Sequence, residues 1–137
     1  MISQYQLEIS TPGRGLIQIS NEIAKYVKTA NIETGICNIF LHHTSASLSL
    51  CENHDPLVLQ DLESFMQRFI PDGDPLFKHT DEGEDDMPSH IRSVITQNSI
   101  NIPITNGKLA LGTWQGIYLW EHRLQAHKRR ITLTMQS

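Results

Sequence analysis

Histidine is the residue type with the widest chemical reach in this chain, and the 137 residues contain seven of them. His43, His79 and His90 stand out, because each lies in a long loop or where a predicted element ends or begins. Imidazole is the commonest protein ligand for zinc, and three histidines that leave one coordination position open form a catalytic pattern. Histidine also titrates near neutral pH, so a general acid or base is an alternative role. No compact metal motif such as HExxH is present, and a surface or packed histidine is the plain alternative for each.

The double histidine, His42-His43, ends the first of two predicted strands in the segment 36–53. Side chains alternate between the faces of a strand, so the buried row of the first strand ends on His43 and that of the second ends on Glu52. Asn53 follows, while His42 is predicted to face outward. Two buried rows that each end on an ionisable residue indicate the rim of a pocket. The alternative is that polar residues simply begin where a strand ends.

The segment 112–116 (GTWQG) is a second candidate for ligand binding. Its paired glycines allow a sharp turn or a close approach of the backbone to a ligand, and Thr113 offers an N–H group and a hydroxyl to an anion. Trp114 offers a flat apolar face to a ring. The alternative is a glycine bulge in a strand that carries a core tryptophan.

An acid on an otherwise apolar strand row marks the C-terminal part of the chain. Glu121 continues the row of Ile117 and Leu119, so its carboxylate is predicted to face inward. Arg129 or Arg130 could pair with this carboxylate or with a phosphate group.

Composition places the chain among globular proteins. Hydrophobic residues make up 39% and charged residues 19%, and 137 residues suffice for one domain that needs no disulfide or metal staple. No apolar run approaches the roughly 20 residues of a membrane span, and residues 1–10 lack the order of a secretion signal. We therefore expect a cytoplasmic protein with no membrane partner. Cys37 and Cys51 are then reduced thiols, unless neighbouring strands allow them to pair.

Charge is distributed unevenly along the chain. The formal net charge of −4 argues against nucleic acid as a partner, because such binding depends on an excess of Lys and Arg. Residues 72–86 contain seven acids and one lysine, and a basic cluster near the C-terminus comprises Arg123, Lys128, Arg129 and Arg130. Solvated surfaces are the first interpretation, and contact between the two patches within the fold or across subunits is the second.

Periodicity predicts one domain with an α+β fold, built from mostly antiparallel, sandwich-like sheets and about three helices. Strands are predicted at 4–10, 15–19, 36–43, 46–51, 99–104, 108–111, 117–124 and 130–135. Helices are predicted from Ser20 or Asn21 to Ala30, from Asp55-Pro56 to just before Pro71, and from Pro88 to about Gln97. The pair Asn106-Gly107 predicts a two-residue hairpin turn.

Three stretches together resemble the YjbQ family, small proteins with a secondary thiamine-phosphate synthase activity. They are HTSASL from residue 43, MPSHI from residue 87 and GTWQGI from residue 112. The resemblance extends over nearly the whole chain, and motif order and length agree. It implies an α+β sandwich-like fold that assembles as a homotrimer with a polar pocket.

The resemblance also implies which residues form that pocket. Carried onto this chain, they are His43, Thr44, Ser45, Glu52, Asn53, His79, Asp85, His90, Thr113, Trp114, Gln115 and Glu121. Asp85 is selected from three adjacent acids, Glu84-Asp85-Asp86. The candidate ligands of a divalent metal, zinc or magnesium, are His43, His79 and His90, and no organic cofactor is expected. Thr113 and Arg129 are candidates for holding the phosphorylated ligand.

The implied reaction joins a phosphorylated thiazole to an aminopyrimidine methyl diphosphate and releases pyrophosphate. It needs cations beside the leaving diphosphate and a flat surface for a ring, roles for which Arg129, Lys78, a metal and Trp114 are candidates. The chain has neither a glycine-rich phosphate loop nor a DDxxD motif. A non-catalytic trimeric protein that binds a metal or small ligand is therefore the alternative function. A protein that docks partners through residues 72–86, a predicted loop that we call the acidic loop, is a third.

Overall fold

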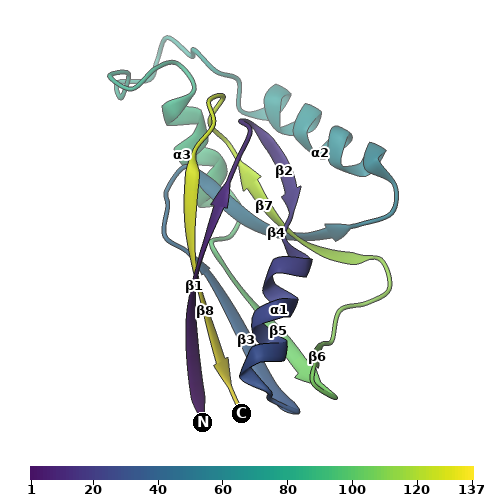
Figure 1. The fold of residues 1–137 in the computed structure, drawn as a ribbon. Helices are drawn as coiled ribbons and strands as arrows, with labels where there is room; N and C mark the ends of the chain where they lie inside the picture. The colour runs from purple at the N-terminus through teal and green to yellow at the C-terminus, as the bar shows by residue number, and fades with distance from the viewer.

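The structure is a computed structural model that describes residues 1–137, and it contains eight strands and three helices (Figure 1). In chain order they are β1 (Ile2–Ser10), β2 (Gly15–Gln18), α1 (Ser20–Ala30), β3 (Thr34–Leu41), β4 (Ala46–Glu52), α2 (Pro56–Phe69), α3 (Asp86–Ile95), β5 (Ser99–Thr105), β6 (Lys108–Leu109), β7 (Gln115–Glu121) and β8 (Lys128–Gln136). The two chain termini lie side by side, and Ser137 N donates a hydrogen bond to Met1 O at 3.1 Å.

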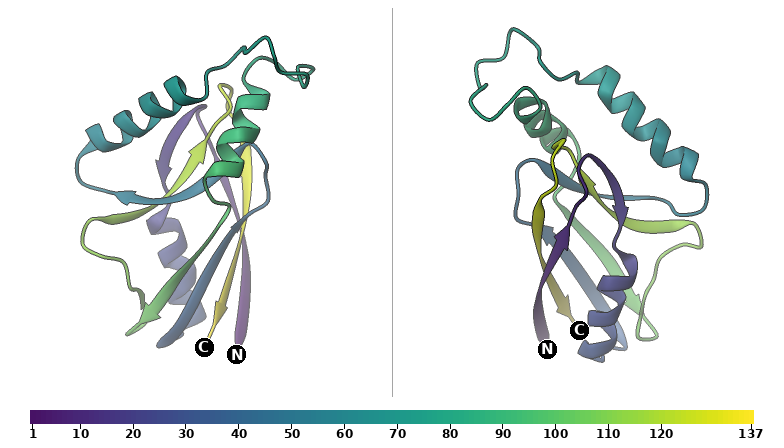
Figure 2. Two further views of the ribbon diagram at one scale, coloured as in Figure 1. Left: turned by 180° about the vertical axis from the view of Figure 1, so that it is seen from behind. Right: turned by 45° about the horizontal axis from the view of Figure 1, so that its top comes forward.

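All strand pairs are antiparallel, and they form two separate sheets. The five-stranded sheet has the order β1-β8-β3-β5-β6, and the three-stranded sheet has the order β2-β7-β4. The two views of Figure 2 show α2 and α3 at the end of the molecule opposite the chain termini, with the loop between them projecting outward. The predicted α+β class, with three helices and antiparallel sheets, is confirmed.

The main core lies between the inner face of the five-stranded sheet and a layer formed by the three-stranded sheet and α1. Ile39 of β3, Leu48 of β4 and Ile23 of α1 are each 0% exposed within this cluster. Because strand side chains alternate, the opposite face of the five-stranded sheet is left to solvent, where Asn38 donates to Asn101 at 2.9 Å. Burial of these apolar rows holds the two layers together and fixes the strand register.

A second, smaller core lies on the other face of β7, which is buried on both faces. This core positions α3, because Ile91 of that helix packs against it. Trp120 of β7 packs with Met66 and Ile70 at the end of α2. Trp120 Nε1 donates to Glu63 Oε1 at 3.0 Å, and the fully buried Arg92 of α3 donates to Glu63 Oε2 at 3.2 Å. This network ties α2, α3 and β7 together at the end of the molecule where the acidic loop lies.

His122 is fully buried, with its ring centroid 5.4 Å from that of Trp120. It predicts how the free energy of unfolding depends on pH. Burial, together with the charges of Arg92, Arg14 and Arg129, lowers the pKa of His122 from 6.5 to about 3. Between these values the unfolded chain binds the proton and the folded chain does not. The free energy of unfolding therefore falls as the pH decreases through this range, by up to about 1.4 kcal/mol per pH unit.

We expect His122→Gln to remove this component of the pH dependence when urea unfolding is measured from pH 7 to pH 4. The matched variant His54→Gln, in an exposed turn, should keep the wild-type dependence. An identical slope for wild type and His122→Gln would contradict the assignment.

Two helix starts differ from the prediction. The residue before α1 is Ile19, which makes no side-chain cap, and the Ser20 hydroxyl instead accepts from Ile117 N at 2.9 Å. A tertiary contact has therefore replaced the expected cap. Helix α3 begins at Asp86, two residues before Pro88, because the first N–H groups of a helix need no intrahelical partner and proline is tolerated there.

The end of β7 also differs from the prediction, which extended this strand to residue 124. The strand stops at Glu121, and the following turn is bound to the acidic loop instead. Leu124 N donates to Asp85 Oδ2 at 2.9 Å, so the backbone there is not available for a strand ladder.

Helix α2 begins as predicted, whereas part of its apolar face is uncovered. The Asp55 side chain accepts from Leu57 N at 2.9 Å and Pro56 is the first helical residue. Met66 is buried, but Phe65 and Phe69 stack on each other in solvent with ring centroids 5.7 Å apart. Leu76 in the following loop is exposed as well. The exposed face indicates a surface that another molecule could cover.

The cap of α2 can be tested by mutation. We expect Asp55→Ala to lower the free energy of unfolding by about 1 kcal/mol, because the N–H group of Leu57 loses its acceptor. Asp61→Ala, which removes an exposed acid from the middle of the same helix, should change it by less than about 0.5 kcal/mol. Equal effects of the two variants in urea unfolding would argue against a stabilising cap.

Three further expectations concern turns, thiols and membranes. Asn106 and Gly107 have φ values of 52° and 75°, which confirms the predicted hairpin turn. Cys37 and Cys51 are both free and lie in different sheets. None of the three helices has the length and apolar content needed to cross a membrane.

Candidate metal centre

The acidic loop and α3 bring together two histidines and one carboxylate, which we call the His79–Asp86–His90 trio. His79 Nε2 lies 2.8 Å from Asp86 Oδ2, and His90 Nε2 lies 3.2 Å from the same oxygen. Asp86 and His90 are four residues apart, so α3 places them on one face. The loop returns His79 to this face, with its ring centroid 5.4 Å from that of His90.

Asp86 is the buried centre of the trio, with 2% of its side chain exposed. Its second oxygen, Oδ1, accepts from Arg123 Nη1 at 2.8 Å. Burial alone would raise the pKa of Asp86, but the hydrogen bond from His79 and the charges of His90 and Arg123 outweigh it and hold the pKa below its usual range. The carboxylate is therefore ionised and oriented, as a metal ligand must be.

The two hydrogen-bond contacts of the His90 ring indicate that a proton or a metal ion lies between His90 and Asp86. His90 Nδ1 faces the carbonyl oxygen of Thr44 at 3.1 Å, and a carbonyl only accepts, so this nitrogen carries a hydrogen. In a neutral ring Nε2 is then an acceptor, yet it faces a carboxylate oxygen of Asp86. Either a second proton on His90 or a bound metal ion would make this contact favourable.

The donor set fits a divalent metal. The three ligand atoms lie within 4.8 Å of one another. Ligands about 2.1 Å from a tetrahedral zinc ion are roughly 3.4 Å apart, close to the spacings of the trio. Arg123 and the Thr44 carbonyl hold the far sides of Asp86 and His90, which is the usual supporting arrangement of a metal site.

The structure selects a different acid and separates His43 from the other two histidines. Asp85, the acid selected from the sequence, accepts from Arg123 Nε at 3.0 Å and stands outside the trio. His43 Nε2 accepts from Arg130 N at 2.8 Å, which leaves this nitrogen unable to bind a metal. Asp86 and Arg123 were missed as site residues, although the spacing from Asp86 to His90 is readable as two ligands one helical turn apart.

His43 instead lines a pocket of about 440 Å³ next to the trio, which we call the His43 pocket. Its lining residues are His43, Thr44, His90, Ser93, Val94, Thr96, Gln97 and Asn98. Burial and the nearby charges of Arg129 and Arg130 lower the pKa of His43, so its ring is neutral at pH 7. Since Nε2 accepts, Nδ1 carries the hydrogen and can donate to a ligand.

Glu121 faces inward as predicted and is 0% exposed, with every lone-pair direction engaged. Arg129 pairs with both carboxylate oxygens, its Nε donating to Oε1 at 2.8 Å. Thr11 Oγ1 donates at 2.7 Å and Arg123 N at 3.1 Å. Arg129 also donates to Ser45 Oγ at 2.9 Å. This saturated network indicates a structural role for Glu121 beside the site.

The remaining predicted residues lie at the far end of the three-stranded sheet. Glu52 pairs with Gln115 in the β4–β7 ladder, whereas Ala46 pairs with Glu121 at the other end. Six residues separate the two ends, roughly 20 Å at about 3.4 Å per residue. This distal group comprises Glu52, Asn53, Thr113, Trp114 and Gln115, and one chain does not bring it to the trio.

Within the distal group, Trp114 is a surface residue. It is 58% exposed, and the ring of His54 lies 5.0 Å from it. Asn53 N donates to Trp114 O at 2.9 Å, and Gly112 N donates to the Gln115 side chain at 2.8 Å. The alternative of a core tryptophan in this segment is therefore wrong, and the flat face of Trp114 is open to solvent.

Comparison with known proteins establishes the family of this chain. The model of the family described as UPF0047 protein YjbQ-like matches residues 5–137. The chain belongs to the YjbQ family. A UPF0047 protein of Synechocystis is 47% identical over 91% of this chain and 85% of its own length. The UPF0047 protein YjbQ of Escherichia coli O157:H7 is 42% identical over 97% of this chain and 96% of its own.

Solved structures of YjbQ relatives have the same fold. An uncharacterized protein of the YjbQ/UPF0047 family from Clostridium acetobutylicum is 32% identical, with a TM-score of 0.83 over 98% of this chain and 99% of that one. A YbjQ-like protein of unknown function from Sulfolobus solfataricus has a TM-score of 0.86 at 25% identity, over 98% of both chains. The sequence-based assignment to the YjbQ family is thus confirmed, and its members' names carry no activity.

Proposed function

We propose that this YjbQ protein is a metal-assisted transferase acting on small phosphorylated molecules, with the thiamine-phosphate synthase reaction as its activity. The observation that carries the proposal is the arrangement of His79 and His90 around one oxygen of the buried Asp86. A divalent cation held there, zinc or magnesium, would supply positive charge to a leaving diphosphate. We propose that the protein acts in the cytoplasm.

In the proposed reaction the thiazole nitrogen attacks the methylene carbon of the aminopyrimidine, and the bond from that carbon to the diphosphate oxygen breaks. The diphosphate leaves with the electron pair, so no base is required in the bond-forming step. The neutral His43 donates from Nδ1 to a phosphate oxygen in its pocket. Arg130 lies close enough to His43 to make this pocket favourable for an anion, whereas the charge of Arg129 is offset by Glu121.

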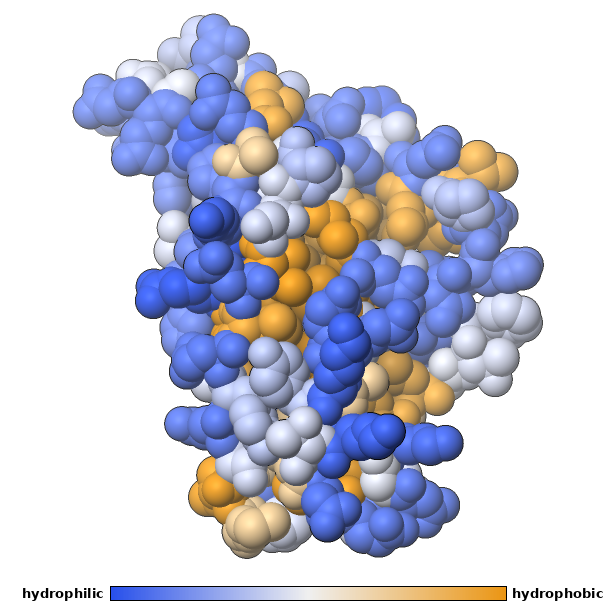
Figure 3. Space-filling view, viewed as in Figure 1, coloured by the Kyte–Doolittle hydropathy of each residue, from blue (hydrophilic) through white to orange (hydrophobic).

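A homotrimer is the assembly that we propose for this activity. Large apolar side chains are more than half exposed at several places: Phe65, Phe69, Leu76, Val94, Trp114 and Leu124. Figure 3 shows apolar side chains reaching the surface over α2 and in the middle of that face. Covering such residues favours association, and a neighbouring copy could bring the distal group of one chain toward the trio of another. Light scattering that gives a monomer mass would contradict this assembly.

Growth of a strain that lacks thiamine-phosphate synthase tests the activity. Wild type is expected to restore growth without added thiamine, and His79→Ala and His90→Ala to fail while expressed and folded. The matched variant His42→Ala, whose ring is on the exposed face of the sheet, should restore growth. Normal growth with both trio variants would show that the trio is not the catalytic site.

A metal- or ligand-binding protein without catalysis is the second candidate. It is favoured by the saturation of Glu121, which leaves no free buried carboxylate beside the His43 pocket. This candidate predicts that the wild type binds metal tightly, yet forms thiamine phosphate too slowly for growth at native expression. A purified-protein assay for pyrophosphate release, with and without added zinc or magnesium, separates the two.

A further inference from the structure

We propose that the His79–Asp86–His90 trio separates two ligand pockets of different charge. The pocket on the loop side binds an amine-bearing, positively charged heteroaromatic ring, and the His43 pocket binds a phosphate group. The inference deepens the proposed function and rests on it for the reaction, but the binding preferences of the pockets can be tested independently.

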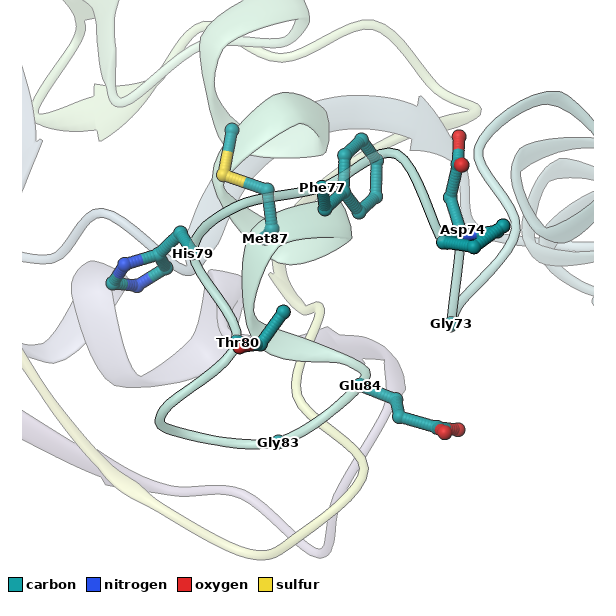
Figure 4. A pocket seen from close by; sticks show the side chains of 9 residues that line it. Gly73, Asp74, Phe77, His79, Thr80, Gly83, Glu84 and Met87 are labelled. Atoms are coloured by element: carbon teal, nitrogen blue, oxygen red, sulfur yellow. The ribbon is translucent and has the colours of Figure 1, made fainter.

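The loop-side pocket has a volume of about 310 Å³, which is within the range of small-molecule sites. It is lined by Gly73, Asp74, Pro75, Phe77, His79, Thr80, Gly83, Glu84 and Met87. Figure 4 shows Phe77 and Met87 close together, with His79 on one side of the pocket and Asp74 and Glu84 on the other. The aromatic ring and the thioether suit a planar ring, because both make favourable contacts with aromatic faces.

The charge of the loop-side pocket is negative. Asp74 and Glu84 line it, and no lysine or arginine does. Other acids of the loop are engaged in ion pairs: Asp72 with Arg14, and Glu82, Asp85 and Asp86 with Arg123. The charges of Asp74 and Glu84 are balanced by no such pair, so a cationic or amine-bearing ligand would be attracted there. Figure 3 shows the surface of this projecting loop as mostly hydrophilic.

The His43 pocket has the opposite preference. No acid lines it. Arg130 acts on His43 from nearby and has no carboxylate partner, whereas Glu121 offsets the charge of Arg129. The side-chain amides of Gln97 and Asn98 and the Nδ1–H of His43 are donors available to an anion. A phosphate group is therefore favoured in this pocket and disfavoured in the loop-side pocket.

The trio lies between the two pockets. His79 lines the loop-side pocket and His90 lines the His43 pocket, while both Nε2 atoms face one oxygen of Asp86. Ligands in the two pockets would approach the same charged centre from either side. This placement suits a reaction that holds an amine-bearing ring on one side of the trio and a phosphate group on the other.

Backbone NMR titrations of the zinc-loaded full chain test the assignment. The probes are 4-aminopyridine, a planar amine-bearing ring that is cationic near neutral pH, and inorganic phosphate. We expect 4-aminopyridine to shift the resonances of Phe77, Thr80 and Gly83, and phosphate to shift those of Thr44 and Asn98. Glu84→Gln should lower the affinity for 4-aminopyridine about tenfold, which is the effect of removing one unit charge at short range. It should leave the affinity for phosphate unchanged.

The matched control is Asp81→Asn, which removes one charge from the same loop outside the pocket and should bind 4-aminopyridine like the wild type. Phe77→Leu is a second variant, which keeps the charge of the pocket and should also lower the affinity for 4-aminopyridine. Equal loss with Asp81→Asn and Glu84→Gln, or one common set of shifted resonances for both probes, would overturn the assignment. Selective binding in a chain that takes up no zinc would support the pockets and refute the proposed metal site.

Discussion

Replacing Glu121 with leucine is expected to lower the free energy of unfolding by about 3–5 kcal/mol, because it leaves the guanidinium of Arg129 buried without its partner. Arg129 is 3% exposed, and its charged partner is Glu121, whereas its other acceptors, Ser45 O and Oγ, are neutral. Thr11 loses the acceptor of its hydroxyl in the same variant. Urea unfolding at pH 7 measures the loss.

The double variant Glu121→Leu/Arg129→Met is the control for this prediction. It removes both charges, so much of the lost stability should return. Two equally destabilised proteins would show that the leucine side chain, rather than the unpaired arginine, causes the loss. Wild-type stability of the single variant would contradict the assignment of Glu121 as a structural anchor.

The same pair gives a pH prediction. Burial acts to raise the pKa of Glu121, but the hydrogen bonds from Arg129 and Thr11 and the charge of Arg129 outweigh it and hold the pKa below 4.5. The folded chain therefore releases this proton more readily than the unfolded chain. The stabilisation is complete above pH 4.5 and is lost as the pH falls through the folded-state pKa. The double variant should lack this acid-dependent component.

Replacing Asp86 with asparagine is expected to weaken zinc binding by more than about 100-fold. The change removes a negatively charged ligand from the trio, and even supporting groups of metal sites are worth about 10- to 100-fold. The near-identical size of the amide keeps α3 in place. Competition with a chromophoric chelator measures the affinity.

Asp85→Asn is the matched control, because Asp85 is the neighbouring acid and shares Arg123 with Asp86. Asp85→Asn should keep zinc affinity within about tenfold of the wild type, since its carboxylate supports the turn at Leu124 and lies outside the trio. The reverse order of effects would assign the metal to Asp85, the acid that the sequence placed in the pocket.

Much of the fold could be predicted from local patterns, because the signals act over short distances. The cap at Asp55, the turn at Asn106-Gly107 and the inward row ending at Glu121 all follow from neighbouring residues. The uncovered side of α2 could not be predicted, since an apolar helical stripe indicates burial without indicating which molecule provides it.

The site could be predicted only in part, because it depends on contacts between distant segments. Two of the three trio residues, His79 and His90, were identified from their positions alone. His43 was grouped with them because strand alternation gives its face but not the Arg130 backbone that occupies its Nε2. Asp86 was passed over for Asp85, since the sequence does not show which of two adjacent acids turns toward the histidines and which toward Leu124.

The central claim, a metal ion held by the trio, is tested most directly by metal content. Untagged chains prepared without chelators would be measured by mass spectrometry for wild type, His79→Ala, His90→Ala and His43→Ala. A metal ion held by the trio predicts about one zinc or similar ion per chain in wild type and His43→Ala, and none in the two trio variants. No metal in the wild type after reconstitution, or a loss confined to His43→Ala, would contradict it.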